Sequence, residues 1–270
     1  MSEKKGISAV QVGNLLAFGA VIIVNSIAGS TKLLGGVNTA DVSAAFPTLI
    51  TPAGFTFAIW GVIYALLAVF VIFQLLPGHR GDAFNEKVSY LFILSSVFNV
   101  VWLFLWQYEY ITASVVLIFA LLLSLIAIYL RLNVGRSNAT RIEKICVHAP
   151  FSVYLGWITI ATIADVSSAL VSISWNGFGI AASTWAQLVT VVALAITLLL
   201  LGTRRDPAYG LVVVWALTGI LANQWANKVV SGVSTVTEAT EGVVAVATLF
   251  VLFLVLVRPP KANAVQPRMP

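Results

Sequence analysis

The sequence has few charged residues, one cysteine and two histidines. Only 9% of its 270 residues are Asp, Glu, Lys or Arg, whereas 60% are hydrophobic. A globular domain of this composition would not stay in solution. The single cysteine, Cys146, excludes an intramolecular disulfide. The chain also lacks a Cys/His metal cluster, a GxGxxG dinucleotide fingerprint and a Walker motif.

The sequence instead contains long apolar runs. Each covers about 20 residues, which is the length that a helix needs to cross a bilayer. The runs fall at 8–29, 54–77, 88–107, 111–131, 146–172, 183–202, 208–226 and 241–257. They are apolar on every face, whereas the strands of a β-barrel alternate apolar and polar residues. The sequence therefore predicts an all-α polytopic transmembrane helix bundle of about eight spans.

The basic residues indicate how the bundle is oriented. With eight spans and the N-terminus inside, all but two of the 15 Lys and Arg residues fall in inner segments, and the exceptions are Lys32 and Lys228. Inner loops carry the excess of positive charge in membrane proteins. We therefore predict that both termini are inside, with a plasma membrane as the simplest location. Anionic lipid head groups explain the net charge of +5, so nucleic acid is not an expected partner.

Asp165 lies in the middle of the fifth run. A carboxylate at the centre of a transmembrane helix costs about 2.5–3.5 kcal/mol on insertion scales, so an acid here suggests a functional site. The alternative is a neutral, protonated Asp165 that is hydrogen-bonded to a neighbouring helix.

Aromatic residues form stripes on three of the predicted helices. Trp60 and Tyr64 share a face of the second, and Trp157, Ala161 and Asp165 share a face of the fifth. The stripe on the third comprises Asn99, Trp102 and Trp106. Such stripes could meet in an apolar pocket with a few polar groups, which is typical of a small-molecule site. They could equally pack helix against helix.

Two connections are long. The first, from Ser30 to Thr51, exceeds the usual length of a loop in a compact fold, so we interpret it as a lid or binding loop. The second, from Ala226 to Thr240, is consistent with an ordinary exposed linker.

Three segments resemble motifs of the tryptophan-rich sensory protein/translocator protein family, also called the peripheral benzodiazepine receptor family. Residues 51–64 (TPAGFTFAIWGVIY) are similar to its second-helix motif, residues 98–102 (FNVVW) to its third and residues 157–165 (WITIATIAD) to its fifth. The resemblance covers about residues 8–178. We therefore divide the chain into a five-span core, 1–178, and three additional spans with a short basic inner tail, 179–270.

The resemblance implies a five-helix bundle that binds tetrapyrroles such as protoporphyrin or haem beneath the loop joining its first two helices. Carried over by position, the pocket comprises Trp60, Asn99, Trp102, Trp157 and Ala161, and Asp165 replaces the family's Asn. Tyr64 and Trp106, which belong to the aromatic stripes, are also predicted to line the pocket. No cofactor is expected to be obligatory, and a porphyrin or haem-type molecule would be a ligand.

Some features depart from the family pattern. The first loop contains no Trp, and Pro52-Ala53 replaces a double proline. Residues 172–177 lack the Tyr and the basic residue of the cholesterol-recognition pattern, so sterol binding is not supported. His79 and His148 fall near the inner side, where we expect them to be solvated or to face head groups. Axial ligation of haem by His is therefore not expected.

Several functions stay open from the sequence. The first is a receptor, carrier or sensor for tetrapyrroles or similar flat aromatic molecules. A transporter that changes the protonation of Asp165 is the second, and a structural or assembly subunit of a membrane complex is the third. An enzyme has the least support, because no nucleophile–base pair or metal site is evident. A homodimer or another membrane partner is compatible with each of these functions.

Overall fold

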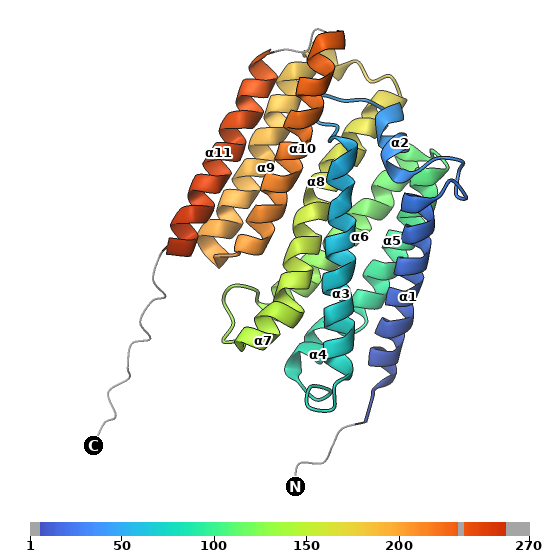
Figure 1. The fold of residues 1–270 in the computed structure, drawn as a ribbon, viewed down its shortest axis with the longest axis vertical. Coiled ribbons are helices and arrows are strands. Elements are labelled where there is room, and N and C mark those ends of the chain that lie inside the picture. Colours follow the sequence, from blue (N-terminus) through green and yellow to red (C-terminus); the bar gives the residue numbers. More distant parts are fainter. Residues whose placement is uncertain (1–5, 232–234, 258–270) are drawn as a thin grey trace.

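The chain folds into long, nearly parallel and antiparallel helices (Figure 1). The computed structural model describes residues 6–231 and 235–257, and no strand occurs among them. The N-terminal helices are α1 (Ala9–Ser30), α2 (Thr39–Ala45), η1 (Gly54–Ala58), α3 (Ile59–Leu75), α4 (Ala83–Val88), α5 (Leu91–Gln107) and α6 (Ile111–Leu132). They are followed by α7 (Arg141–Glu143), η2 (Lys144–His148), α8 (Ala149–Ser172), η3 (Gly177–Gly179), α9 (Ala182–Arg204), α10 (Pro207–Ser231) and α11 (Thr235–Val257).

Each predicted apolar run forms one helix of the bundle. Six helical segments in the described part of the chain are long and apolar enough to cross a bilayer, and α5 and the stretch Glu241–Leu254 of α11 are shorter apolar helices. Many of their large apolar side chains face outward, such as Leu16, Val116 and Phe250. In a bilayer these side chains would contact lipid tails. The prediction of an all-α polytopic bundle is confirmed.

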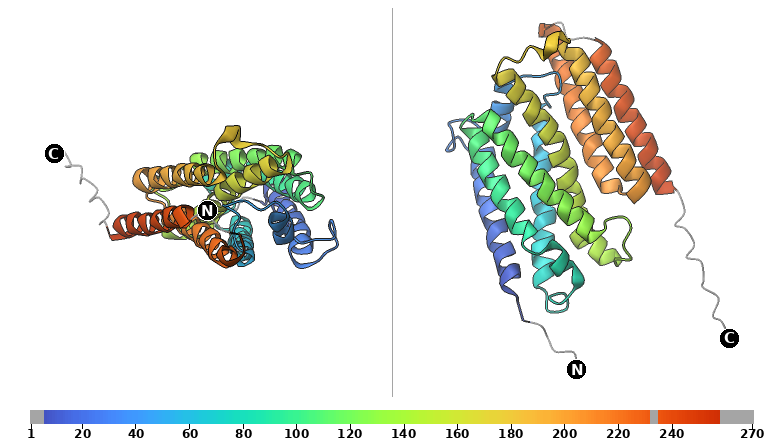
Figure 2. Two further views of the ribbon diagram at one scale, coloured as in Figure 1. Left: turned by 90° about the horizontal axis from the view of Figure 1, so that it is seen from above. Right: turned by 180° about the vertical axis from the view of Figure 1, so that it is seen from behind.

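The helices form two groups. In the first, α1, α3, α5, α6 and α8 pack around a common core, and in the second, α9, α10 and α11 pack on one another at one side of it (Figures 1 and 2). Contact between the groups is made mainly by α10, which packs on α8 and η1. The predicted boundary at residue 178 falls in the turn between α8 and α9. The predicted basic tail, 258–270, lies outside the described residues.

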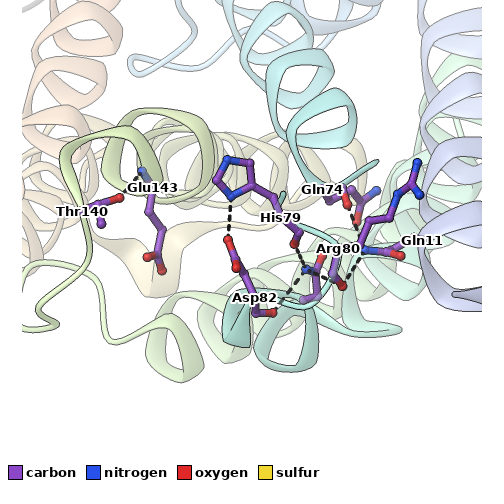
Figure 3. A network of polar contacts seen from close by, with 8 residues as sticks. Gln11, Gln74, His79, Arg80, Asp82, Thr140 and Glu143 are labelled. Carbon is purple, nitrogen blue, oxygen red and sulfur yellow. Dashed lines mark hydrogen bonds and ion pairs between the residues drawn. The ribbon is translucent and has the colours of Figure 1, made fainter. Parts of the chain in front are cut away.

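Buried amides join α1 to its neighbours. Gln11 Nε2 donates to the Gln74 carbonyl at 2.9 Å (Figure 3). Asn14 Nδ2 donates to Gln74 Oε1 at 3.0 Å. Further along α1, Asn25 Nδ2 donates to Asn99 Oδ1 at 2.8 Å. In a bilayer, apolar helix faces gain little free energy from the hydrophobic effect when they associate, because lipid tails are equally apolar. Side-chain hydrogen bonds of this kind help to hold the helices together.

Helix α8 begins with a π turn. Pro150 has no N–H and cannot donate to the carbonyl four residues earlier, so an α-helix is disrupted there. The Ala149 N–H instead donates to the Lys144 carbonyl, five residues back, and η2 widens by one residue. Pro150 thereby occupies the first turn of α8, where a missing N–H is tolerated.

The two ends of the bundle differ in charge. The described basic residues of the segments 80–87, 131–144 and 204–205 lie at the end that carries α4 and α7, whereas the connection between α1 and α2, which contains Lys32, lies at the opposite end (Figure 1). His79 is at the basic end and lies 2.7 Å from Asp82 Oδ2 (Figure 3). His148 is also near this end, but our expectation that it is solvated was wrong. It is only 4% exposed and is one of the buried residues of the π turn.

Candidate functional site

The four tryptophans predicted for the site meet near the α2 end of the bundle. Trp60 of α3 lies with its ring centroid 6.2 Å from both Trp102 of α5 and Trp157 of α8. Trp106 stacks on Trp102 at 6.0 Å, one helical turn closer to α2. The i, i+4 spacing on α5 and the crossing of three helices bring these rings together. They line a cavity of about 40 Å³, together with Ala161 and Asp165.

Asp165 is held by two neighbouring helices. Its side chain is 2% exposed, and Oδ2 accepts a hydrogen bond of 2.9 Å from Trp102 Nε1. Ser114 Oγ of α6 lies 2.9 Å from Asp165 Oδ1 and 2.7 Å from the carbonyl of Ile111. One hydroxyl proton cannot serve both acceptors. A neutral carboxyl group would resolve this conflict, because it could donate to Ser114 Oγ while that hydroxyl donates to the carbonyl.

Two predicted residues lie outside the cavity wall. Tyr64 stacks on Trp60 at 5.6 Å but sits a turn further from α2. Asn99 is fully buried and accepts the hydrogen bond from Asn25, so it connects α5 to α1. Among the cavity residues, Trp157 is distinctive: its Nε1 is buried and has no hydrogen-bond partner in the described part of the chain.

The segment 31–53, here called the cover segment, lies over the cavity. It contains α2, and Thr39, Ser43, Ile50 and Thr51 contribute to the cavity wall. Helix α2 begins at a capping box in which Asn38 Oδ1 accepts from the Ala40 and Asp41 N–H groups. The predicted lid is therefore a structured element.

The first part of the cover segment is anchored to α5. Gln107 Nε2 donates to the carbonyls of Ala28 and Val37 at 3.2 and 3.0 Å, and Trp106 Nε1 donates to the Thr39 carbonyl at 3.2 Å. Gly35 has a φ of +66°, and a Cβ there would meet the Gln107 carbonyl oxygen at 2.0 Å. Only glycine allows the chain to approach α5 this closely.

The last part of the cover segment is anchored to α10. The Ala53 N–H donates to the Gly219 carbonyl at 3.0 Å, and Asn223 Nδ2 donates to the Thr51 carbonyl at 3.0 Å. Gln224 Nε2 also donates to the Leu49 carbonyl. In addition, Ala216 of α10 lines the cavity. Helix α10 therefore completes the site.

Sequence reasoning missed several of these residues. Ser114, Gln107 and Ala216 are each a small or polar residue on an apolar helix, and nothing in their local pattern indicates which neighbour they will meet. Asn223 and Gln224 stand out in the sequence only as polar residues near the end of a span. This doublet is the one signal that could have indicated a contact with the cover segment, since polar amides in a span usually bond across helices.

The fold and the site define a polytopic helical membrane protein with an aromatic cavity beneath a helical cover. A family model described as TSPO-like protein matches residues 11–257, and the chain belongs to this family. The match extends over α9, α10 and α11, whereas the resemblance drawn from the motifs stopped near residue 178. No curated protein and no solved structure matches the chain.

Proposed function

We propose that this protein is a receptor or carrier that binds a tetrapyrrole or a similar flat aromatic molecule in the aromatic cavity. The observation that carries the proposal is the convergence of Trp60, Trp102, Trp106 and Trp157 on one cavity beside Asp165. Aromatic rings offer stacking surfaces to a flat ligand, and the unpartnered Trp157 N–H offers a donor. Membership of the TSPO-like family supports the same assignment.

Binding of such a ligand requires the cavity to open. A volume of about 40 Å³ accommodates a few water molecules at most. The cover segment is held at residues 37–39 by α5 and at residues 49–53 by α10. The stretch between these anchors contains α2, so we propose that α2 moves away to admit the ligand. The rings beneath it would then separate and stack on the ligand.

Quenching of tryptophan fluorescence by protoporphyrin IX in detergent-purified protein tests this function. We expect saturable quenching in the parent protein. Trp157→Phe removes the unpartnered N–H and part of the ring, and Trp60→Phe removes the ring at the centre of the cluster. Each should weaken binding about three- to tenfold, because central aromatic residues contribute most to binding.

The matched control is Trp225→Phe, because Trp225 is 65% exposed and lies outside the cavity. It should leave the affinity unchanged. Linear quenching that does not saturate, or an equal effect of all three substitutions, would contradict binding in the cavity and leave the rings as packing residues.

We further propose that α2 faces the outside of a plasma membrane. The basic residues at the opposite end of the bundle support this orientation. Cys146 is the only natural cysteine, so a Cys146→Ser background allows single reporters at Leu33→Cys and Asn138→Cys. A membrane-impermeant maleimide applied to intact cells should label the first and spare the second. The reverse pattern would invert the orientation.

A further inference from the structure

A second, larger pocket lies between the two groups of helices. It measures about 1020 Å³ and is lined by α8 and α9, with contributions from α6, α10 and residues 47–50. Helices α8 and α9 make little direct contact, whereas α10 packs on both, and the space between α8 and α9 is here called the wedge. Ile50 lines both this wedge and the aromatic cavity, so the cover segment separates the two.

The dimensions of the wedge match one leaflet of a bilayer. Its wall extends along α8 from Thr159 to Val171 and along α9 from Ala182 to Ile196. At 1.5 Å per residue these stretches are about 18 and 21 Å long, which is somewhat more than half of the roughly 30 Å hydrocarbon thickness. Trp175 and Trp185 lie at the α2 end of the wedge. Tryptophan is common at membrane–water interfaces, so these two residues are consistent with an interface at this end.

The chemistry of the wall changes along its length. No Asp, Glu, Lys, Arg or His is among the described residues that line it. The hydroxyls of Thr159, Thr162 and Ser167 each donate to a carbonyl of their own helix, so the deep part is effectively apolar. Amide side chains occur only at the α2 end, from Asn176, Asn223 and Gln224.

The wedge is open toward the lipid. Val171 at its α2 end is 44% exposed, and Val192 and Ile196 at its deep end are 54% and 37% exposed. A molecule could therefore enter sideways without moving the cover segment. A free fatty acid would bring a carboxylate to a wall without a basic residue, whereas the ester region of a phospholipid needs only neutral donors.

We infer that the wedge is a binding site for a phospholipid of the leaflet on the α2 side. One acyl chain lies between α8 and α9, and its ester region lies beside the amides of Asn176 and Gln224. The site is separate from the aromatic cavity, and this inference does not depend on the proposed function.

Photo-crosslinking of the parent protein in phosphatidylcholine nanodiscs tests the site. The probe is a phosphatidylcholine with a diazirine in the middle of one acyl chain, and the adducts are mapped by mass spectrometry. We expect adducts on residues 159–171 and 182–196 to exceed, by about fivefold per exposed area, those on the outward face of α6. Adducts in proportion to exposed apolar area alone would overturn the inference.

A pair of matched substitutions sharpens the test. Val166→Trp fills the wedge, whereas Val116→Trp adds the same ring to a residue of α6 that is 67% exposed. The first should reduce adducts on 182–196 about tenfold, and the second should leave them unchanged, because each methylene excluded from an apolar site lowers affinity several-fold. Equal effects would overturn the inference.

Competition on the parent protein in detergent micelles, where no unlabelled phospholipid surrounds it, requires no variant. Unlabelled phosphatidylcholine should displace the probe, and oleate or protoporphyrin IX at the same concentration should displace it less. Stronger displacement by oleate would assign the wedge to free fatty acids, and stronger displacement by the porphyrin would assign it to flat rings. Either result would overturn the phospholipid assignment.

Discussion

Gly219→Ala is expected to lower the free energy of unfolding by about 2–3 kcal/mol, because it pushes α10 away from η1. A Cβ at Gly219 would lie 1.9 Å from Thr56 Oγ1 and 2.8 Å from Thr56 Cβ. Rotation of the Thr56 side chain can move Oγ1 but not Cβ, so the backbone must shift. Thr56 is fully buried, and the shift would also strain the hydrogen bond from the Ala53 N–H to the Gly219 carbonyl. The midpoint of thermal unfolding by circular dichroism measures the change.

Gly61→Ala provides the control for this prediction. Gly61 also lies within a helix, and a Cβ there meets nothing within 4 Å. Alanine favours a helix over glycine by up to about 1 kcal/mol, so this variant should be as stable as the parent or more so. Combining Gly219→Ala with Thr56→Gly should recover part of the loss, since the second change removes the opposing Cβ. Equal stability of Gly219→Ala and Gly61→Ala would contradict the close approach.

Asp165→Leu is expected to destabilise the protein by about 1–3 kcal/mol, whereas Asp165→Asn is expected to change stability little. Leucine leaves the buried N–H of Trp102 without an acceptor. Asparagine satisfies every partner: its oxygen accepts from Trp102, its amide donates to Ser114 Oγ, and the Ser114 hydroxyl donates to the Ile111 carbonyl. Thermal unfolding of the detergent-purified variants compares the two.

The same pair separates a receptor from a transporter. If the site only binds a ligand, Asp165→Asn should retain protoporphyrin affinity within about twofold, because the hydrogen bonds around the cavity are preserved. If Asp165 must exchange a proton during transport, Asp165→Asn would bind ligand but abolish its uptake into vesicles. A loss of stability as large as that of Asp165→Leu would show that the network requires a carboxyl group, contrary to both expectations.

The local sequence pattern is sufficient to predict the helices and part of the candidate site. An uninterrupted apolar run in a bilayer must form a helix, because only then are its backbone N–H and C=O groups hydrogen-bonded within the segment. Composition alone therefore locates the spans near 54–77 and 111–131. Helical spacing likewise places Trp102 and Trp106 on one face, as well as Trp157 and Asp165. The convergence of these faces on one cavity was a hypothesis, because the same spacing also suits helix packing. Tyr64 and Asn99 share the stripes but lie outside the cavity wall.

The sequence by itself determined the helical class, the charge asymmetry between the two ends and the presence of an acid within a span at Asp165. Composition and helical period are local properties, and they required no knowledge of neighbours. The tertiary structure decided which partners these residues have. Ser114 meets Asp165 across 51 positions, and Asn223 meets Thr51 across 172. Contacts at such separations depend on how α6, α8 and α10 cross, and small or polar residues on an apolar helix carry no local signal of the helix they will face.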